Sequence, residues 1–237
     1  MQQTFDFPVI PKYRFDNFVV CGGNETAYRF ALKLASGDGT ENLLYIHGPE
    51  GSGKTHLLSA VAERLGTLPV ITFADEERYD PAGADGDSVS SLFDPFRGLP
   101  ALLVDDLQLL PDDDRMRVAL WQLFNEFYTA GTPIVMTGSL PPKELPGLDG
   151  HLVSRLLWGL VAPLDISDDD SRRMIMKKLA ADRQIVLPAD AIDYLLVHVP
   201  RDIPSLRAAL DRVSRFSLAT GRKVSARLAR EALATVP

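Results

Sequence analysis

Residues 48–55, Gly-Pro-Glu-Gly-Ser-Gly-Lys-Thr, constrain the fold of this 237-residue chain more than any other stretch. They fit the pattern G-x-x-x-x-G-K-[S/T], in which glycines let backbone N–H groups converge on phosphate oxygens that side chains would otherwise block. A short apolar run at 43–47 predicts a buried strand before the loop, and apolar residues at helical spacing predict a helix at 54–65 after it. A glycine-rich turn that only caps a helix is the alternative, and this context weighs against it.

The loop also provides most of the expected nucleotide contacts. Lys54 is expected to pair with the β and γ phosphates, and the Thr55 hydroxyl is expected to ligate Mg²⁺. The other loop residues expected at the nucleotide are Gly48, Pro49, Gly51, Ser52, Gly53 and His56. The same loop occurs in kinases, switches and motors, so the purpose of the nucleotide must be inferred from the rest of the chain.

Two carboxylates follow a second apolar run, Ala-Leu-Leu-Val-Asp-Asp at 101–106. A short continuous apolar run is typical of a central strand of a parallel sheet, and such strands end at the edge where ligands bind. Asp105 is therefore expected to hold Mg²⁺ through water, and Asp106 to orient the attacking water. The alternative is a carboxylate pair that caps the turn into 107–110, which would be favoured if the phosphate loop were absent.

The order of the other predicted elements indicates an α/β fold with a parallel sheet. Further strands are expected at 70–73 and 133–137, and further helices at 24–35 and 114–130. After Pro163 the pattern becomes purely helical, with helices expected at 168–183, 188–198, 204–219 and 224–234. These patterns divide the chain into an α/β nucleotide-binding subdomain at 11–164 and a helical subdomain at 165–237, preceded by a flexible peptide at 1–10.

Composition excludes several other classes of protein. The net charge of −7 gives no sequence-independent reason to bind a nucleic-acid backbone, so strong direct DNA binding is not expected. A single cysteine excludes an internal disulfide and a cysteine-based metal cluster. No apolar run reaches the roughly 18 residues that a membrane span requires, and the N-terminus does not read as a signal peptide. We therefore expect a cytoplasmic protein without a membrane partner.

Several segments together resemble the AAA+ module of the bacterial replication initiator family DnaA. They are FDNFVVCGGNETAYRFA (15–31), the loop itself (48–58), LLVDDLQLL (102–110), PIVMTGSLPPKELPGLD (133–149), LVSRLLWGL (152–160) and DIPSLRAALDRV (202–213). The resemblance covers nearly the whole chain and implies a five-stranded parallel P-loop core with a C-terminal helical lid. It also implies ADP or ATP with Mg²⁺ as ligands, and Phe18 and Val19 join the expected nucleotide contacts.

Within this family, a lone AAA+ module with TGSLPP at 137–142 is most similar to the Hda-like regulators. That resemblance implies the initiator DnaA and the polymerase sliding clamp as partners, with a homo-oligomer left open. It also implies that Arg155 is an arginine finger that reaches a nucleotide on a neighbouring subunit. Considered alone, an arginine on a predicted helix is more often a solvated surface residue.

The extreme N-terminus resembles the clamp-binding peptide of these regulators. Gln2, Phe5 and Phe7 keep the glutamine and two large apolar groups of that peptide, whereas Gln3 departs from it at the second position. An extended segment can place the glutamine in a polar subsite and the two rings in an apolar pocket. The alternative is that both phenylalanines fold back onto the chain's own core.

Two departures from the initiator pattern predict weak catalysis. Ser139 stands where the family has an acidic first sensor, and Pro204 stands at the sensor-two arginine of the lid. Tight nucleotide binding with slow turnover is therefore expected, so that the chain is at most a weak ATPase, and the choice between ADP and ATP stays open. Trp121 and Trp158 are expected to be core or packing residues. A helicase-loader-type ATPase remains the alternative, whereas a small-molecule kinase has no visible acceptor site.

Overall fold

The computed structural model describes residues 13–234 except residue 39, residues 68–69 and residues 75–87. The chain divides into two compact units, one at Tyr13–Asp165 and one that begins at Ile166. The expected clamp-binding residues Gln2, Phe5 and Phe7 lie outside the described residues.

A five-stranded parallel sheet forms the centre of the first unit, which confirms the predicted fold class. In sequence the strands are β1 (Leu43–His47), β2 (Ile71–Thr72), β3 (Leu102–Asp105), β4 (Ile134–Gly138) and β5 (Leu160–Pro163). Their order across the sheet is β2-β3-β4-β1-β5, so β1 is paired on both sides. The strand β5 was not among those predicted from the sequence pattern, because it is a short edge strand whose side chains are mostly not buried.

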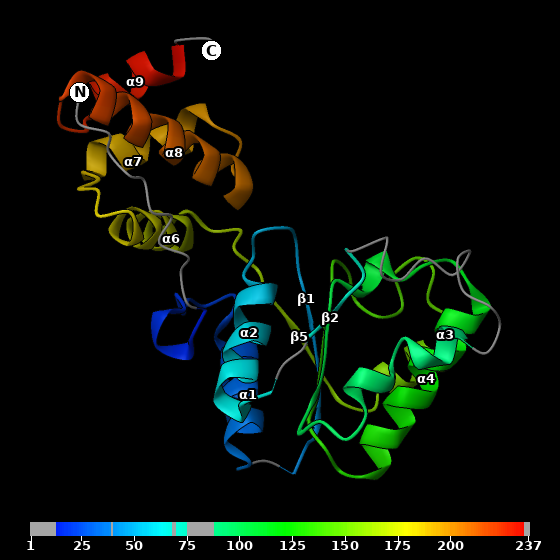
Figure 1. The fold of residues 1–237 in the computed structure, drawn as a ribbon. Helices are drawn as coiled ribbons and strands as arrows, with labels where there is room; N and C mark the ends of the chain where they lie inside the picture. The colour runs from blue at the N-terminus through cyan, green and yellow to red at the C-terminus, as the bar shows by residue number, and fades with distance from the viewer. Residues whose placement is uncertain (1–12, 39, 68–69, 75–87, 235–237) are drawn as a thin grey trace, which may run out of the picture. The chain divides into compact units, whose positions relative to one another are not determined.

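Helices cover both faces of this sheet (Figure 1). The helices α1 (Glu25–Ser36) and α2 (Lys54–Leu65) lie on one face, and α3 (Ser88–Ser91) and α4 (Asp114–Thr129) lie on the other, together with α5 (Gly150–Leu156). Successive side chains of a strand point to opposite faces. Leu43 and Tyr45 of β1 accordingly pack in the α4 core, whereas Leu44 and Ile46 pack in the α2 core. Short 3₁₀ turns, Phe15–Asn17, Asp94–Phe96 and Leu107–Leu109, complete this unit.

The second unit is helical over its described residues, 166–234. Its helices are α6 (Asp169–Asp182), α7 (Ala189–His198), α8 (Ile203–Thr220) and α9 (Ala226–Ala234). Asp168 and Asp202 cap α6 and α8 by accepting hydrogen bonds from backbone N–H groups of the first turn. Each of these helices begins and ends within two residues of its predicted bounds.

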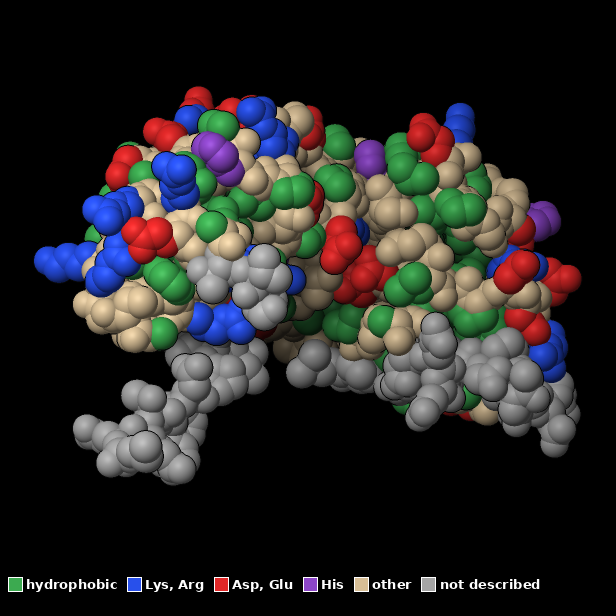
Figure 2. Space-filling model, turned by 90° about the horizontal axis from the view of Figure 1, so that it is seen from above, with side chains coloured by type: hydrophobic (Ala, Val, Ile, Leu, Met, Phe, Trp, Pro, Cys, Tyr) green, Lys and Arg blue, Asp and Glu red, His purple; other side chains and the backbone are tan. Residues whose placement is uncertain are grey.

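Charge is divided unevenly between the two units. Residues 166–237 hold 13 of the 25 Lys and Arg residues but only 9 of the 32 Asp and Glu residues. Figure 2 shows several of these basic side chains over the helical unit, at the left of the view. The acidic excess that argues against binding to a nucleic-acid backbone therefore belongs to the α/β unit. No helix within the described part of the chain is long and apolar enough to span a membrane.

Candidate functional site

The phosphate loop joins β1 to α2, and its glycines have geometries that a side chain would not tolerate. A Cβ added at Gly48 would lie 2.5 Å from the carbonyl oxygen of Leu164. Gly51 and Gly53 have φ angles of 75° and 103°, in the region that favours glycine. The sequence therefore holds the backbone in the open, curved form through which N–H groups approach phosphate.

Lys54 is buried in this loop without an opposite charge. It is only 7% exposed, and its Nζ donates hydrogen bonds to the carbonyl oxygens of Gly48 at 3.0 Å and Pro49 at 3.2 Å. No carboxylate of the described residues forms an ion pair with it. A buried ammonium group is unfavourable unless an anion accompanies it, and two neutral carbonyls do not supply one. The loop therefore fits an anionic ligand.

The hydrogen-bonding groups around Lys54 fit the same ligand. Ser52 Oγ is buried and has no hydrogen-bond partner among the described residues. The first N–H groups of α2 have no intrahelical acceptor, and they carry the positive end of the helix dipole. Unsatisfied donors at a helix N-terminus beside an uncompensated lysine form a site suited to phosphate oxygens.

The expected Mg²⁺ ligands lie side by side. Thr55 Oγ1 donates to Asp105 Oδ2 at 2.7 Å, so the hydroxyl expected to ligate Mg²⁺ lies beside the carboxylate expected to hold the ion through water. No cluster of three or more His, Cys, Asp or Glu side chains in the described part of the chain could hold a metal ion alone. The residues fit Mg²⁺ as it usually binds with nucleotides, where water and phosphate oxygens complete the coordination.

A chain of hydrogen bonds extends from Asp105 to the first-sensor position. Thr137 Oγ1 donates to Asp105 Oδ1 at 2.5 Å and accepts from the Asp106 N–H at 2.9 Å. Gln108 Nε2 donates to Asp106 Oδ1 at 2.9 Å, and Gln108 Oε1 accepts from the Ser139 N–H at 3.0 Å. Sequence reasoning missed Thr137 and Gln108, although one ends a predicted strand and the other follows the carboxylate pair by two residues.

Two of the residues expected at the nucleotide, Phe18 and His56, lie together at the phosphate loop. The Phe18 ring lies against Gly53, where an added Cβ would be 2.9 Å from the ring, and it meets the His56 ring edge-on at a centroid distance of 5.1 Å. Val19 follows in the same segment, and its carbonyl oxygen accepts from Asn24 Nδ2 at 2.9 Å. Phe18 and His56 thus form an aromatic pair beside the phosphate loop.

The end of β1 is tied to the sensor segment by a buried tyrosine. Tyr45 donates to the Leu140 carbonyl oxygen at 2.9 Å, and a Cβ at Gly138 would lie 1.9 Å from the Tyr45 hydroxyl, so only glycine fits there. Burial raises the pKa of Tyr45, which stays neutral. Burial also lowers the pKa of His47, against the opposing effect of Glu144, so His47 is neutral at pH 7 beside the loop.

Arg155 is not hydrogen-bonded to this group of residues. It lies in the last turn of α5, where its Nε donates to Asn125 Oδ1 of α4 at 3.0 Å. Its guanidinium carbon lies 3.8 Å from the centroid of the Trp158 ring. Trp158 is 48% exposed and packs on Tyr128 and Arg155, so of the two expected roles it has the packing role and not the core role, whereas Trp121 is partly buried and packs against the core.

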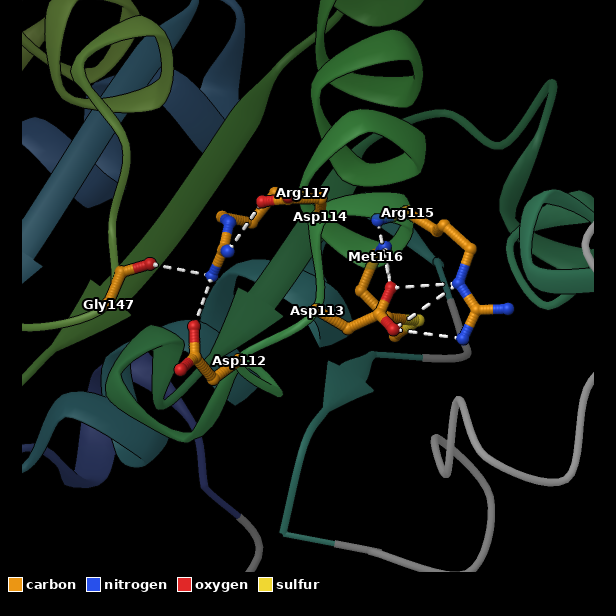
Figure 3. A network of polar contacts seen from close by, with 7 residues as sticks. All are labelled: Asp112, Asp113, Asp114, Arg115, Met116, Arg117 and Gly147. Carbon is orange, nitrogen blue, oxygen red and sulfur yellow. Dashed lines mark hydrogen bonds and ion pairs between the residues drawn. The ribbon is translucent and has the colours of Figure 1, made fainter.

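A second arginine on the same side of the sheet has different surroundings (Figure 3). Arg117 in α4 donates to Asp112 at 2.8 Å, to Asp114 at 2.7 Å and to the Gly147 carbonyl oxygen at 3.5 Å. The hydrogen bonds to these two carboxylates raise the pKa of Arg117 further above its usual value. This network joins the start of α4 to the loop before α5.

The lid unit supplies no cation at its predicted sensor position. Pro204 lies in the first turn of α8, where its missing N–H is not needed. The nearby Arg201 forms an ion pair with Asp169 at 3.5 Å. The expected departure from the sensor-two arginine is thus a proline that stabilises the helix start.

Comparison with known proteins assigns both units of the chain. The family described as the bacterial DnaA ATPase domain matches residues 9–163, and the family described as the Hda lid domain matches residues 169–233.

The individual proteins that this chain resembles also include DnaA proteins. A chromosomal replication initiator protein DnaA from Clavibacter sepedonicus is 33% identical over 214 residues, which are 87% of this chain but only 45% of that initiator. Domain III of the Thermotoga maritima replication initiation protein DnaA superposes with a TM-score of 0.81 at 30% identity, covering 96% of this chain and 98% of that one. An AMPPCP-bound DnaA from Aquifex aeolicus shares the fold, with a TM-score of 0.76 at 24% identity over 86% of this chain and 65% of that one.

Proposed function

Because the chain belongs to the DnaA family of bacterial AAA+ ATPase domains and has an Hda-type lid, we propose that it is a nucleotide-bound regulator of replication initiation. In this proposal it binds ADP or ATP with Mg²⁺, docks on the polymerase sliding clamp and presents Arg155 to a nucleotide held by a DnaA initiator. The observation that carries the proposal is that Lys54 and Arg155 of one chain both lack a carboxylate partner among the described residues. Lys54 is buried in the phosphate loop, and Arg155 lies at the end of α5.

Nucleotide binding is supported by the chemistry of the loop. Lys54 needs an anion, Ser52 needs a hydrogen-bond partner, and Thr55 lies beside the carboxylate of Asp105, which would hold Mg²⁺ through water. The AMPPCP-bound relative carries an ATP analogue on the same fold. When bound, Mg²⁺ would neutralise phosphate charge, while Lys54 and the loop N–H groups hold the phosphates in place.

Slow turnover by the chain itself is supported by three features. Ser139 offers a hydroxyl where an acidic sensor would stand, and Pro204 offers no cation from the lid. Arg155 contacts Asn125 and Trp158 rather than the chain's own phosphate loop. The nucleotide would then act mainly to organise the two units, and Asp106 would have little assistance in orienting water.

Action on a partner is supported by the donors that Arg155 keeps available. An arginine supplied by a neighbouring subunit stabilises the negative charge that develops on the transferred phosphoryl group, and such a finger is worth about 10³ to 10⁵ in rate. The initiator's own residues would position its ATP and the attacking water. The chain described here would contribute the missing positive charge.

Docking on the clamp would depend on Gln2, Phe5 and Phe7. We propose that they bind as an extended peptide, and the clamp would raise the local concentration of the chain near the initiator. The test is hydrolysis of ATP by the initiator in the presence of DNA-loaded clamp, with the full chain and with a chain lacking residues 1–8. The proposal expects stimulation that requires both the clamp and the N-terminal residues.

Three results would contradict the proposal. Stimulation that is equal with and without residues 1–8 and the clamp would remove the docking step. Binding of the chain to a replicative helicase, with rapid ATP turnover and no effect on the initiator, would favour the helicase-loader alternative. Failure to bind ADP or ATP even at about 1 mM, the weak end of binding affinities, would remove the nucleotide itself.

A further inference from the structure

We infer that Asn125 and Trp158 are positioning residues that hold Arg155 in advance as a fork for the phosphate of a nucleotide on another subunit. The inference rests on the proposed function for its biological meaning, because only an acting Arg155 needs such support. Its geometric part, a preset guanidinium, can be tested on the isolated chain.

The guanidinium of Arg155 is held at two places and left open at a third. Its Nε–H donates to Asn125 Oδ1 at 3.0 Å, and its flat face lies on the Trp158 ring at 3.8 Å. Among the described residues, no hydrogen bond or ion pair occupies the two terminal Nη groups. Those groups form the part of the fork that grips two oxygens of a carboxylate or phosphate at once.

Both supports are themselves fixed to the fold. Asn125 belongs to α4, one residue after the fully buried Phe124. The Trp158 ring packs on Tyr128 of the same helix at a centroid distance of 5.2 Å, and the backbone N–H of Trp158 donates to the Arg155 carbonyl oxygen at 3.0 Å. The turn that ends α5 therefore places the Trp158 ring against the Arg155 guanidinium.

The residue types of Asn125 and Trp158 suit side chains that orient Arg155 without neutralising its charge. A carboxylate at position 125 would neutralise the guanidinium and compete with a phosphate, whereas the neutral amide orients it and leaves its charge available. An indole face adds a cation–π attraction without consuming any N–H donor. Trp158 stays 48% exposed, so core packing alone does not explain a side chain of this size, and the contact with Arg155 gives its ring face a role.

Holding a long side chain ready reduces the entropy lost when a partner binds. A free arginine samples many rotamers, and a preset one loses less on docking. Position also matters for rate, since displacement of a catalytic group by about 1 Å can lower a rate by about 10². Loss of either support is therefore expected to lower the stimulated rate at saturation more than the apparent affinity for the partner.

The first arm of the test uses the isolated full chain and NMR of the Arg155 side chain. In the wild type, the ring current of Trp158 should shift the Arg155 δ-methylene protons upfield, and the Nε–H should exchange slowly. Trp158→Leu should abolish the upfield shift, Trp158→Phe should retain part of it, and Asn125→Ala should speed up Nε–H exchange. Trp121→Phe is the matched control and should leave both signals unchanged.

The second arm measures hydrolysis of initiator-bound ATP at saturating concentrations of each variant. Trp158→Leu and Asn125→Ala should each lower the stimulated rate about 10-fold to 100-fold. Trp158→Phe should restore it to within about two-fold, since phenylalanine also presents a π face. Thermal unfolding of each variant shows whether the fold is kept, and the half-exposed position of Trp158 predicts that it is.

The two arms separate failure of the inference from failure of the proposed function. A wild-type Arg155 without an upfield shift and with fast Nε–H exchange would overturn the inference, whatever the second arm shows. Stimulation that is unchanged in Trp158→Leu and Asn125→Ala but lost in Arg155→Ala would also overturn it while leaving the proposed function intact. Absence of stimulation by the wild type, with the NMR signature present, would refute the proposed function and the phosphate role of the fork.

Discussion

Arg117 and Arg155 lie on the same side of the sheet, one in α4 and the other in α5, but their surroundings differ in kind. The Arg117 side chain is 15% exposed and donates to two carboxylates and a carbonyl oxygen (Figure 3). Arg155 is held by one neutral amide and one aromatic face. The first arginine uses both of its terminal nitrogens within the chain, whereas no hydrogen bond or ion pair from the described residues occupies those of the second.

The difference separates a structural arginine from one suited to act on a ligand. A guanidinium bonded to Asp112 and Asp114 gains nothing by turning to a phosphate, because it would have to give up charge-assisted hydrogen bonds. Arg155 gives up nothing of that kind. The two arginines therefore differ in their partners rather than in residue type. Replacing Arg155 should mainly affect action on a partner's nucleotide, whereas replacing Arg117 should mainly affect stability.

The largest expected difference follows from replacing each arginine by lysine. Arg155→Lys should lower stimulated hydrolysis of initiator-bound ATP by about 10² or more, because lysine has no planar face and no forked donors. Arg117→Lys should leave stimulation within about two-fold, since an ammonium group can still pair with the two carboxylates. The measurement is the stimulated rate at saturating chain. Equal losses at both positions would end the distinction.

A smaller effect is expected on stability, in the reverse direction. Arg117→Ala should lower the thermal unfolding midpoint more than Arg155→Ala does, because Asp112 and Asp114 would face each other without their shared partner. Circular dichroism melts of the two variants and the wild type provide the comparison. An Arg155→Ala variant that is the less stable of the two would show that Arg155 is mainly structural.

The smallest expected effect is a dependence on salt. Asp112 and Asp114 are 92% and 93% exposed, so their attraction to Arg117 is open to screening. The difference in melting temperature between the wild type and Arg117→Ala should shrink as ionic strength rises from about 0.1 M to 1 M, where the Debye length falls from about 10 Å to 3 Å. The NMR signature of Arg155 stacked on Trp158 should persist over the same range.

Parts of this structure could be predicted from the sequence because their signals are local. The strand at 43–47 and the helix at 54–65 have the predicted bounds, since a continuous apolar run and a glycine-rich loop determine both. The strand β5 was not predicted, because only one of its four residues is buried and it ends in proline. The α/β class and the helical second unit did not depend on that strand.

The candidate site divides in the same way. Lys54, Thr55 and Asp105 were expected at the site from motif spacing. In the structure Lys54 is hydrogen-bonded to the phosphate loop, and Thr55 is hydrogen-bonded to Asp105. Thr137 and Gln108 were missed, because their hydrogen bonds join residues that are 31 and 32 positions apart and no pattern in one segment reports them. The exposed position of Trp158 likewise depends on how α5 packs against α4.

The most direct test of the central claim follows labelled ATP that has been loaded on the initiator before the chain is added. Only the partner's nucleotide is then observed, so turnover by the chain's own site does not contribute. The account predicts that the wild-type chain with loaded clamp accelerates hydrolysis and that Arg155→Ala lowers this acceleration by about 10³ or more, while the variant still binds nucleotide and clamp. Full acceleration by Arg155→Ala would contradict the claim that Arg155 acts on the partner's nucleotide.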